Sequence, residues 1–275
     1  MKLHIRHTTR YRYTEPLRYS VQALHLWPSS GACQTVLDWR IQAPASVVAQ
    51  PDCLGNHVHA FSLVARSEQN LRELSVVAEG VVLTHGVAVF DDAPGLPHPF
   101  FYRRSTPHAE PHPRMAAWAR QRLPALALDG SLPSVADLVQ LASAVADQVR
   151  YQPGRTAVET TALEAFDWGL GVCQDQAHVM VAICRSLGWP ARYVSGYFHA
   201  ASDPALASHA WADVCIDTAA ARWVSVDVTH RCLTDERHIR LAAASDYTAC
   251  PPIKGVRRGG GHESMEVSIA IGAVP

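Results

Sequence analysis

The sequence predicts an α+β protein in which an N-terminal antiparallel β-sandwich domain precedes a core with a buried helix packed on an antiparallel sheet. Residues 1–85 carry short strand-like runs broken by Pro, Gly and Asn. After residue 113 the periodicity becomes helical, and it returns to alternation between residues 191 and 229. A length of 275 residues fits about two domains. We therefore divide the chain into residues 1–105 and residues 106–275.

Composition and charge exclude several classes of protein. Hydrophobic residues make up 48% of the chain and charged residues 18%, which is typical of a packed globular protein. The net charge of -1 gives no basic field for nucleic acid. No apolar run approaches the ~18 residues of a membrane span, and the N-terminus lacks the apolar segment of a signal peptide. We expect a cytoplasmic protein with neither nucleic-acid nor membrane partners.

The cysteines and histidines show no spacing typical of a metal site. Seven cysteines cannot all pair, and a reducing compartment predicts free thiols. The chain has no Cys-x-x-Cys pair. The short histidine pairs His57–His59 and His108–His112 lie on strand-like and proline-rich segments, and such pairs often bind nothing. We expect neither a metal nor a cofactor.

The N-terminal half is predicted to consist of strands followed by a connector. Alternating or β-branched runs occur at residues 3–5, 11–13, 37–41 and 76–82. From Gly86 to Pro113 the prolines at 94, 97, 99, 107, 111 and 113 predict a semi-extended connector, and the domain boundary falls near its end.

The C-terminal half is predicted to contain four helices and then strands. A short helix covers residues 113–123, and Ser134 caps a longer one. Thr161 and Glu164 fit a capping box that opens a helix ending at Gly169. The segment 172–187 is apolar over most of its surface, which indicates a helix buried in the centre. Strands follow at residues 191–199, 209–217, 222–229 and 265–271.

Cys173 stands at the start of the predicted buried helix. The free N–H groups and the positive dipole end of a helix stabilise a thiolate. The preceding Gly169 and Gly171 allow a sharp turn and leave room for a substrate to approach. Cys173 is therefore a candidate nucleophile, and its backbone N–H is a candidate oxyanion donor.

Two downstream strands place a histidine and a carboxylate on one face. His209 and Asp227 lie at equivalent positions of alternating runs. A hairpin turning at residues 218–220 would place the two side chains directly opposite each other, with their Cβ atoms ~5 Å apart. Cys173, His209 and Asp227 would then supply the nucleophile, the base and the residue that orients the base, which covalent acyl transfer requires.

At these residues the sequence resembles the transglutaminase-like superfamily, whose papain-related fold carries a Cys–His–Asp triad in this chain order. The tail at residues 238–255 resembles bacterial members, and the N-terminal strands resemble the β-domain that precedes their core. The resemblance is carried by the segments 171–178, 191–197, 208–214 and 223–229.

The resemblance implies a cysteine enzyme that acts on amide bonds of a protein or peptide substrate. Gln174 follows Cys173 where animal transglutaminases have tryptophan, and we find no counterpart of their calcium-site regions. Either water or an amine could resolve the thioester on Cys173. A catalytically silent peptide-binding module is the alternative. Trp211, Gln174 and Tyr197 are the candidate substrate-binding residues.

Overall fold

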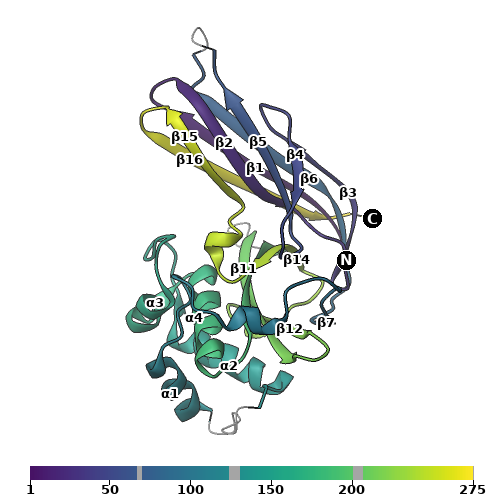
Figure 1. Cartoon of the computed structure of the whole chain (residues 1–275), viewed down its shortest axis with the longest axis vertical. Helices are drawn as coiled ribbons and strands as arrows, with labels where there is room; N and C mark the ends of the chain where they lie inside the picture. The colour runs from purple at the N-terminus through teal and green to yellow at the C-terminus, as the bar shows by residue number, and fades with distance from the viewer. Residues whose placement is uncertain (67–69, 124–130, 201–206, 275) are drawn as a thin grey trace.

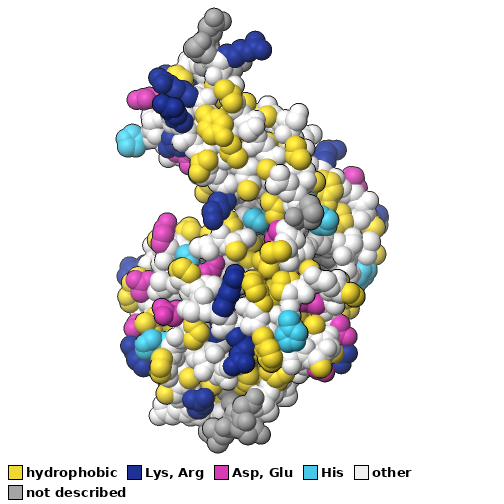
Figure 2. Space-filling view, viewed as in Figure 1, with side chains coloured by type: hydrophobic (Ala, Val, Ile, Leu, Met, Phe, Trp, Pro, Cys, Tyr) yellow, Lys and Arg dark blue, Asp and Glu magenta, His cyan; other side chains and the backbone are white. Residues whose placement is uncertain are grey.

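The protein, seen here in a computed structural model that describes residues 1–66, 70–123, 131–200 and 207–274, has two parts. A β-sandwich forms one end of the molecule, and a core of helices and a sheet forms the other (Figure 1). In the space-filling view, the side of the molecule is hollowed where the two parts meet (Figure 2). No helix among the described residues is long and apolar enough to cross a membrane.

Alternating side chains build the sandwich, as the sequence predicts. Two antiparallel sheets, ordered β16-β1-β6-β3 and β15-β2-β5-β4, enclose a core that includes Leu3, Ile5, Leu24 and Phe61. Every second residue of β6 is buried, because successive side chains of a strand point to opposite faces. The N-terminal strands are β1 (Lys2–Tyr13), β2 (Leu17–Trp27), β3 (Gln34–Gln42), β4 (Val48–Pro51), β5 (His57–Val64) and β6 (Glu73–Thr84).

The last two strands of the chain return to the sandwich. β15 (Ile253–Gly259) pairs with β2, and β16 (Glu263–Ala273) pairs with β1 along its full length. The division at residues 105 and 106 assigns these strands to the core, whereas their hydrogen bonds lie with the sandwich. Alternation along the sequence indicates a strand but carries no information about its partner.

The connector between the two parts contains short regular elements. Strand β7 (Val89–Asp91) adds to the core sheet by pairing with β12, and a 3-10 helix, η1, spans Pro99–Arg103. The connector therefore runs along the core before the first α-helix begins.

The four predicted helices are confirmed. Their bounds are α1 (Pro113–Arg122), α2 (Val135–Gln148), α3 (Ala162–Trp168) and α4 (Cys173–Ser186). Ser134 caps α2, and Thr161 forms the capping box of α3 with Glu164. Gly169 ends α3 with a φ of 68°, a conformation that glycine adopts without steric cost.

The core sheet lies against α4 and carries the candidate site. Its main strands run in the order β13-β12-β11-β10-β14, all antiparallel. Val179 and Ile183 of α4 belong to one buried cluster with Val214 and Val224 of the sheet. The strands are β10 (Ala191–Phe198), β11 (Ser208–Asp217), β12 (Arg222–Asp227), β13 (Cys232–Leu233) and β14 (His238–Ala244).

Two short strands and a 3-10 helix are further elements of the core in the described part of the chain. Strand β8 (Arg150–Tyr151) pairs in parallel with β9 (Leu170–Gly171), just before α4. Another 3-10 helix, η3 (Tyr247–Ala249), leads from β14 toward the sandwich.

Candidate active site

Hydrogen bonds to the first turn of α4 fix the backbone around Cys173. Asp175 Oδ2 accepts the backbone N–H of Val172 at 2.8 Å and the hydroxyl of Thr156 at 2.7 Å. Burial raises the pKa of Asp175, although these hydrogen bonds oppose the shift. A Cβ atom on Gly171 would lie 2.6 Å from Asp175 Cβ, so this position requires glycine.

A second anchor connects α4 to the segment that follows Asp227. The Thr229 hydroxyl donates to Gln176 Oε1 at 2.7 Å, and Gln176 Nε2 donates to the carbonyl of Val149 at 2.7 Å. Gln176 and Thr229 thus hold the nucleophile helix and the acid-bearing strand in a fixed relative position.

The structure corrects the predicted hairpin register. The strands pair Ala212 with Val226 and Asp213 with Ser225, which is two residues away from the register that would place His209 directly opposite Asp227. The turn occupies residues 218–221, one more than predicted, and a bulge interrupts the pairing between Cys215 and Asp217. A shift of two preserves the face of every side chain. His209 therefore still reaches Asp227, and its Nε2 lies 2.7 Å from Oδ2.

Cys173 and His209 face the same cavity, which has a volume of about 220 Å³. With His209 Nε2 bonded to Asp227, the ring directs Nδ1 away from the carboxylate. Nδ1 is buried, and none of the described residues forms a hydrogen bond with it. It is close enough to Cys173 for the thiol to influence its titration. Nδ1 is thus the ring nitrogen that can exchange a proton with a group in the cavity.

Electrostatics favour a charged His209. Burial alone would lower the pKa of His209, but the Asp227 carboxylate, with a smaller contribution from Cys173, raises it to about 10. Burial likewise opposes ionisation of Asp227, and the surrounding imidazoles hold its pKa well below the usual range. This is the charge arrangement in which a protonated imidazole stabilises a neighbouring thiolate.

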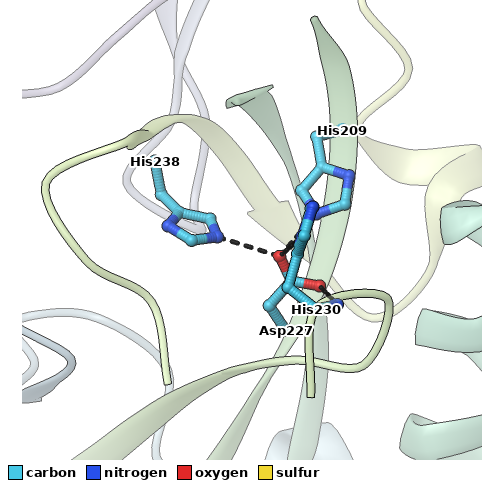
Figure 3. A group of neighbouring side chains, drawn as sticks. All are labelled: His209, Asp227, His230 and His238. Carbon is cyan, nitrogen blue, oxygen red and sulfur yellow. Dashed lines mark hydrogen bonds and ion pairs between the residues drawn. The ribbon is translucent and has the colours of Figure 1, made fainter. Parts of the chain in front are cut away.

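Two further histidines contact the same carboxylate (Figure 3). His230 Nδ1 lies 2.7 Å and His238 Nε2 lies 2.9 Å from Asp227 Oδ2, the atom that His209 also contacts. Neither residue was predicted from the sequence to belong to the site. His230 lies three residues beyond Asp227, which is a local signal, whereas no local pattern places His238 here.

The four residues His209, Asp227, His230 and His238 also form a set that could hold a metal ion, with ligand atoms within 4.8 Å of one another. Three imidazoles and a carboxylate would suit zinc, and bonds of about 2.0–2.2 Å in a tetrahedral site would place any two ligand atoms roughly 3.3–3.5 Å apart. The observed contacts to Oδ2, at 2.7–2.9 Å, are hydrogen-bond distances. The geometry is therefore that of an ionised carboxylate surrounded by N–H donors.

The candidate substrate-binding residues lie in two different places. Gln174 and Tyr197 line the cavity with Cys173, as does Tyr193. Trp211 is 2% exposed and is not among the residues that line the cavity. Its ring packs against His209 and His238 at centroid distances of 6.2 and 5.4 Å. Trp211 therefore packs against these two histidines outside the cavity.

The remaining cysteines differ from Cys173 in their surroundings. All seven cysteines lie within the described residues and are free thiols. Burial raises the pKa of Cys184, Cys215 and Cys250, which keeps these thiols protonated. Cys173 is the cysteine that shares a cavity with His209.

A cysteine at a helix start, a buried histidine and a carboxylate behind it define the papain-like class of cysteine enzymes. Structural comparison agrees with this fold. A candidate cysteine protease from Cytophaga hutchinsonii superposes with a TM-score of 0.75 at 18% identity, covering 100% of this chain and 92% of that one.

Comparison of sequences identifies the family. Residues 126–228 match the transglutaminase-like superfamily, and residues 3–83 match the bacterial transglutaminase-like N-terminal region. An uncharacterized protein of Mycobacterium leprae is 29% identical, covering 98% of both chains. One of Mycobacterium tuberculosis is 27% identical, covering 98% of this chain and 92% of its own. The chain belongs to the transglutaminase-like superfamily.

Proposed function

We propose that this protein is a cysteine-dependent acyl-transfer enzyme that acts on amide bonds through a thioester on Cys173. The observation that carries the proposal is the placement of His209. Its Nε2 is bonded to the buried Asp227, while its unpartnered Nδ1 belongs to a ring that lines the same cavity as Cys173. This arrangement leaves one ring nitrogen for orientation and the other for proton transfer.

In the first half-reaction, the Cys173 thiolate forms a bond to the amide carbonyl carbon, and the carbonyl electrons move to oxygen. The backbone N–H of Cys173, in the first turn of α4, is the candidate donor to this oxyanion. When the intermediate collapses, the C–N bond breaks and the departing nitrogen takes the proton from His209 Nδ1. Ammonia or an amine leaves, and the acyl group stays on sulfur.

In the second half-reaction, an acceptor attacks the thioester. Water or a primary amine loses a proton to His209 Nδ1 and bonds to the acyl carbon. The C–S bond then breaks and regenerates the thiolate. The candidate acceptors give different products: water gives a carboxylic acid, and an amine gives a new amide.

The cavity supports a neutral amide as the reacting group. None of the described residues that line it is Asp, Glu, Lys or Arg. Polar groups come from Gln174, Ser195 and the tyrosines, among other uncharged side chains. A small cavity with a few placed polar groups suits a neutral side-chain or peptide amide better than a charged substrate.

Incubation with a glutamine-containing donor peptide, with and without cadaverine, tests the proposal by mass spectrometry. Amine incorporation indicates transfer, conversion of glutamine to glutamate indicates side-chain hydrolysis, and a cut backbone indicates proteolysis. We expect one of these products, and we expect Cys173→Ala to abolish it. Absence of every product over a broad peptide library would contradict the proposal.

Iodoacetamide labelling at pH 6 provides a substrate-independent check. Cys53 is exposed, whereas Cys173 is only partly accessible. Accessibility alone would make Cys53 react faster. We expect Cys173 to react at least tenfold faster, because only the thiolate is nucleophilic and His209 stabilises it. Equal or slower labelling of Cys173 would favour a silent peptide-binding module.

A further inference from the structure

Asp227 receives more hydrogen bonds than a triad requires. Oδ2 contacts three imidazole nitrogens, those of His209, His230 and His238, at 2.7, 2.7 and 2.9 Å. The backbone N–H of His230 donates to the other oxygen, Oδ1, at 3.1 Å. A carboxylate oxygen accepts hydrogen bonds from all three rings only while it is ionised and each ring presents an N–H.

His230 reaches Asp227 from the loop after β12. Its Nδ1–H donates to Oδ2, and its ring stacks on Phe198 with centroids 4.1 Å apart and planes at 24°. The side chain of His230 is 24% exposed, whereas those of His209 and Asp227 are fully buried. His230 is thus the partly accessible member of the network.

His238 reaches Asp227 from the start of β14, on the opposite edge of the sheet from β13. Its Nδ1 accepts the backbone N–H of Asp235 at 3.0 Å, so the neutral ring carries its proton on Nε2 and donates it to Asp227. Asp235 Oδ1 lies 3.1 Å from the same Nδ1 and would accept from it if the ring were protonated. In both states Nε2–H points at Asp227.

Each additional N–H changes how strongly Asp227 attracts the proton on His209. A donor that bonds the ionised carboxylate stabilises its charge and lowers its basicity. The proton shared between Asp227 and His209 is then held less tightly. A histidine that bound its proton too firmly could not deliver it to the departing nitrogen.

We propose that His230 and His238 are positioning residues that keep Asp227 ionised and oriented. By donating to its carboxylate they lower its basicity, so the proton between Asp227 and His209 is held less tightly. The role in catalysis rests on the function proposed above. The hydrogen-bond arrangement and its effect on His209 do not depend on which amide is the substrate.

Other charged and titratable groups around this network must be considered in its pH dependence. Cys173 faces His209 from α4, and Cys232 of β13 pairs with Asp227 in the sheet. Asp235 and Arg237 form an ion pair beside His238, and Arg240 lies two residues further along β14. None of them donates a hydrogen bond to Asp227 among the described residues, so His230 and His238 can be varied separately from them.

The test measures the ionisation of His209 directly, by NMR of full-length protein labelled with ¹⁵N-histidine, and indirectly through the pH profile of Cys173 alkylation. His230→Phe keeps a ring to stack on Phe198 but removes the donor. We expect the pKa of His209 and the alkaline limb of the alkylation profile to rise by about one pH unit. His230→Asn retains an N–H donor and should stay near the wild-type profile. His238→Gln likewise retains an N–H donor at the other position and should also stay near the wild-type profile.

His98→Phe is the matched control, because His98 also contacts a phenylalanine, Phe100, but lies on the connector. It should leave both readouts unchanged. An unchanged His209 pKa in His230→Phe, or an equal shift in His230→Asn, would overturn the proposal. So would a stoichiometric metal ion bound by the wild-type protein as purified. A confirmed shift without acyl transfer would leave this inference standing and count against the proposed function alone.

Discussion

His7 of the sandwich and Tyr197 of the core sheet form a buried hydrogen bond between the two parts of the molecule. His7 Nδ1 lies 2.7 Å from Tyr197 Oη, and His7 Nε2 lies 3.1 Å from Thr9 Oγ1. Burial lowers the pKa of His7 to about 4 and raises that of Tyr197, so the ring is neutral and the phenol keeps its proton. Tyr197 therefore donates to Nδ1. Because Tyr197 also lines the cavity, the sandwich holds one wall of the candidate site.

Removal of this hydrogen bond should destabilise the whole chain. Tyr197→Phe keeps the ring but leaves His7 Nδ1 buried without a donor, and we expect a loss of about 1–3 kcal/mol in the free energy of unfolding. Urea denaturation followed by tryptophan fluorescence measures it. Tyr19→Phe is the control, since Tyr19 is exposed on a strand of the sandwich and should change stability by less than about 0.5 kcal/mol. Equal effects would show that the hydrogen bond contributes nothing.

His7 should also make stability depend on pH in the acid range. Its pKa is about 4 in the folded chain and about 6.5 when unfolded, so the unfolded state binds more protons between these values. The stability is complete above pH 6.5 and is lost as the pH falls toward 4, by about 2–3 kcal/mol at pH 4.5. Denaturation at pH 7.5 and 4.5 should show that His7→Gln reduces this difference. If His7→Gln lost as much stability between pH 7.5 and 4.5 as the wild type does, His7 would not be the group that makes stability depend on pH.

His209 should affect stability in the opposite direction. Its pKa is raised, so its ion pair with Asp227 stabilises the fold below its unfolded pKa of about 6.5. That contribution decreases as the pH rises toward 10. Asp227→Asn removes the charge that raises this pKa, and we expect its stability to vary less between pH 6.5 and 9.5. Alkylation of Cys173 should slow at least tenfold in the same variant. If Cys173 were alkylated in Asp227→Asn at the wild-type rate, Asp227 would have no role in the proposed mechanism.

Local features of the sequence predicted most of the elements that hold Cys173. The capping boxes, the glycine at the end of α3 and the apolar surface of α4 each depend on residues within a few positions of one another. The face on which each side chain of β11 and β12 lies was also predictable, because a register shift of an even number of residues leaves it unchanged. The register itself depended on a bulge and a longer turn, which alternation does not reveal.

The features that the sequence did not predict depend on contacts between residues that are far apart along the chain. His238 comes from β14 and meets Asp227 only because β14 and β12 lie in one folded sheet. The apolar residues of β16 alternate as in any strand, those of β15 do not, and nothing local indicates that the partners of these strands are β1 and β2. The contact of His238 with Asp227 and the pairing of β15 and β16 with the sandwich are therefore both products of tertiary structure.

Gly171 offers a test of how accurately the start of α4 must be placed. In Gly171→Ala the new Cβ would lie 2.6 Å from Asp175 Cβ, so the Asp175 cap or Cys173 must shift. We expect a loss of about 1–3 kcal/mol in stability, measured by urea denaturation. We also expect at least tenfold slower alkylation of Cys173. Gly272→Ala, where a Cβ meets nothing within 4 Å, is the control and should match the wild type. Unchanged labelling in Gly171→Ala would show that the helix start tolerates displacement.

The return of the C-terminal strand to the sandwich should make stability depend on the last residues of the chain. Ile271 of β16 pairs with Ile5 and packs against the sandwich core, whereas Val267 of the same strand is 46% exposed. Ile271→Ser should therefore lower the free energy of unfolding by about 2 kcal/mol, because apolar contacts with the core are lost. Val267→Ser should cost less than about 0.5 kcal/mol at its exposed position. Thermal and urea denaturation compare the pair. If both variants behaved alike, β16 would not share the core of the sandwich.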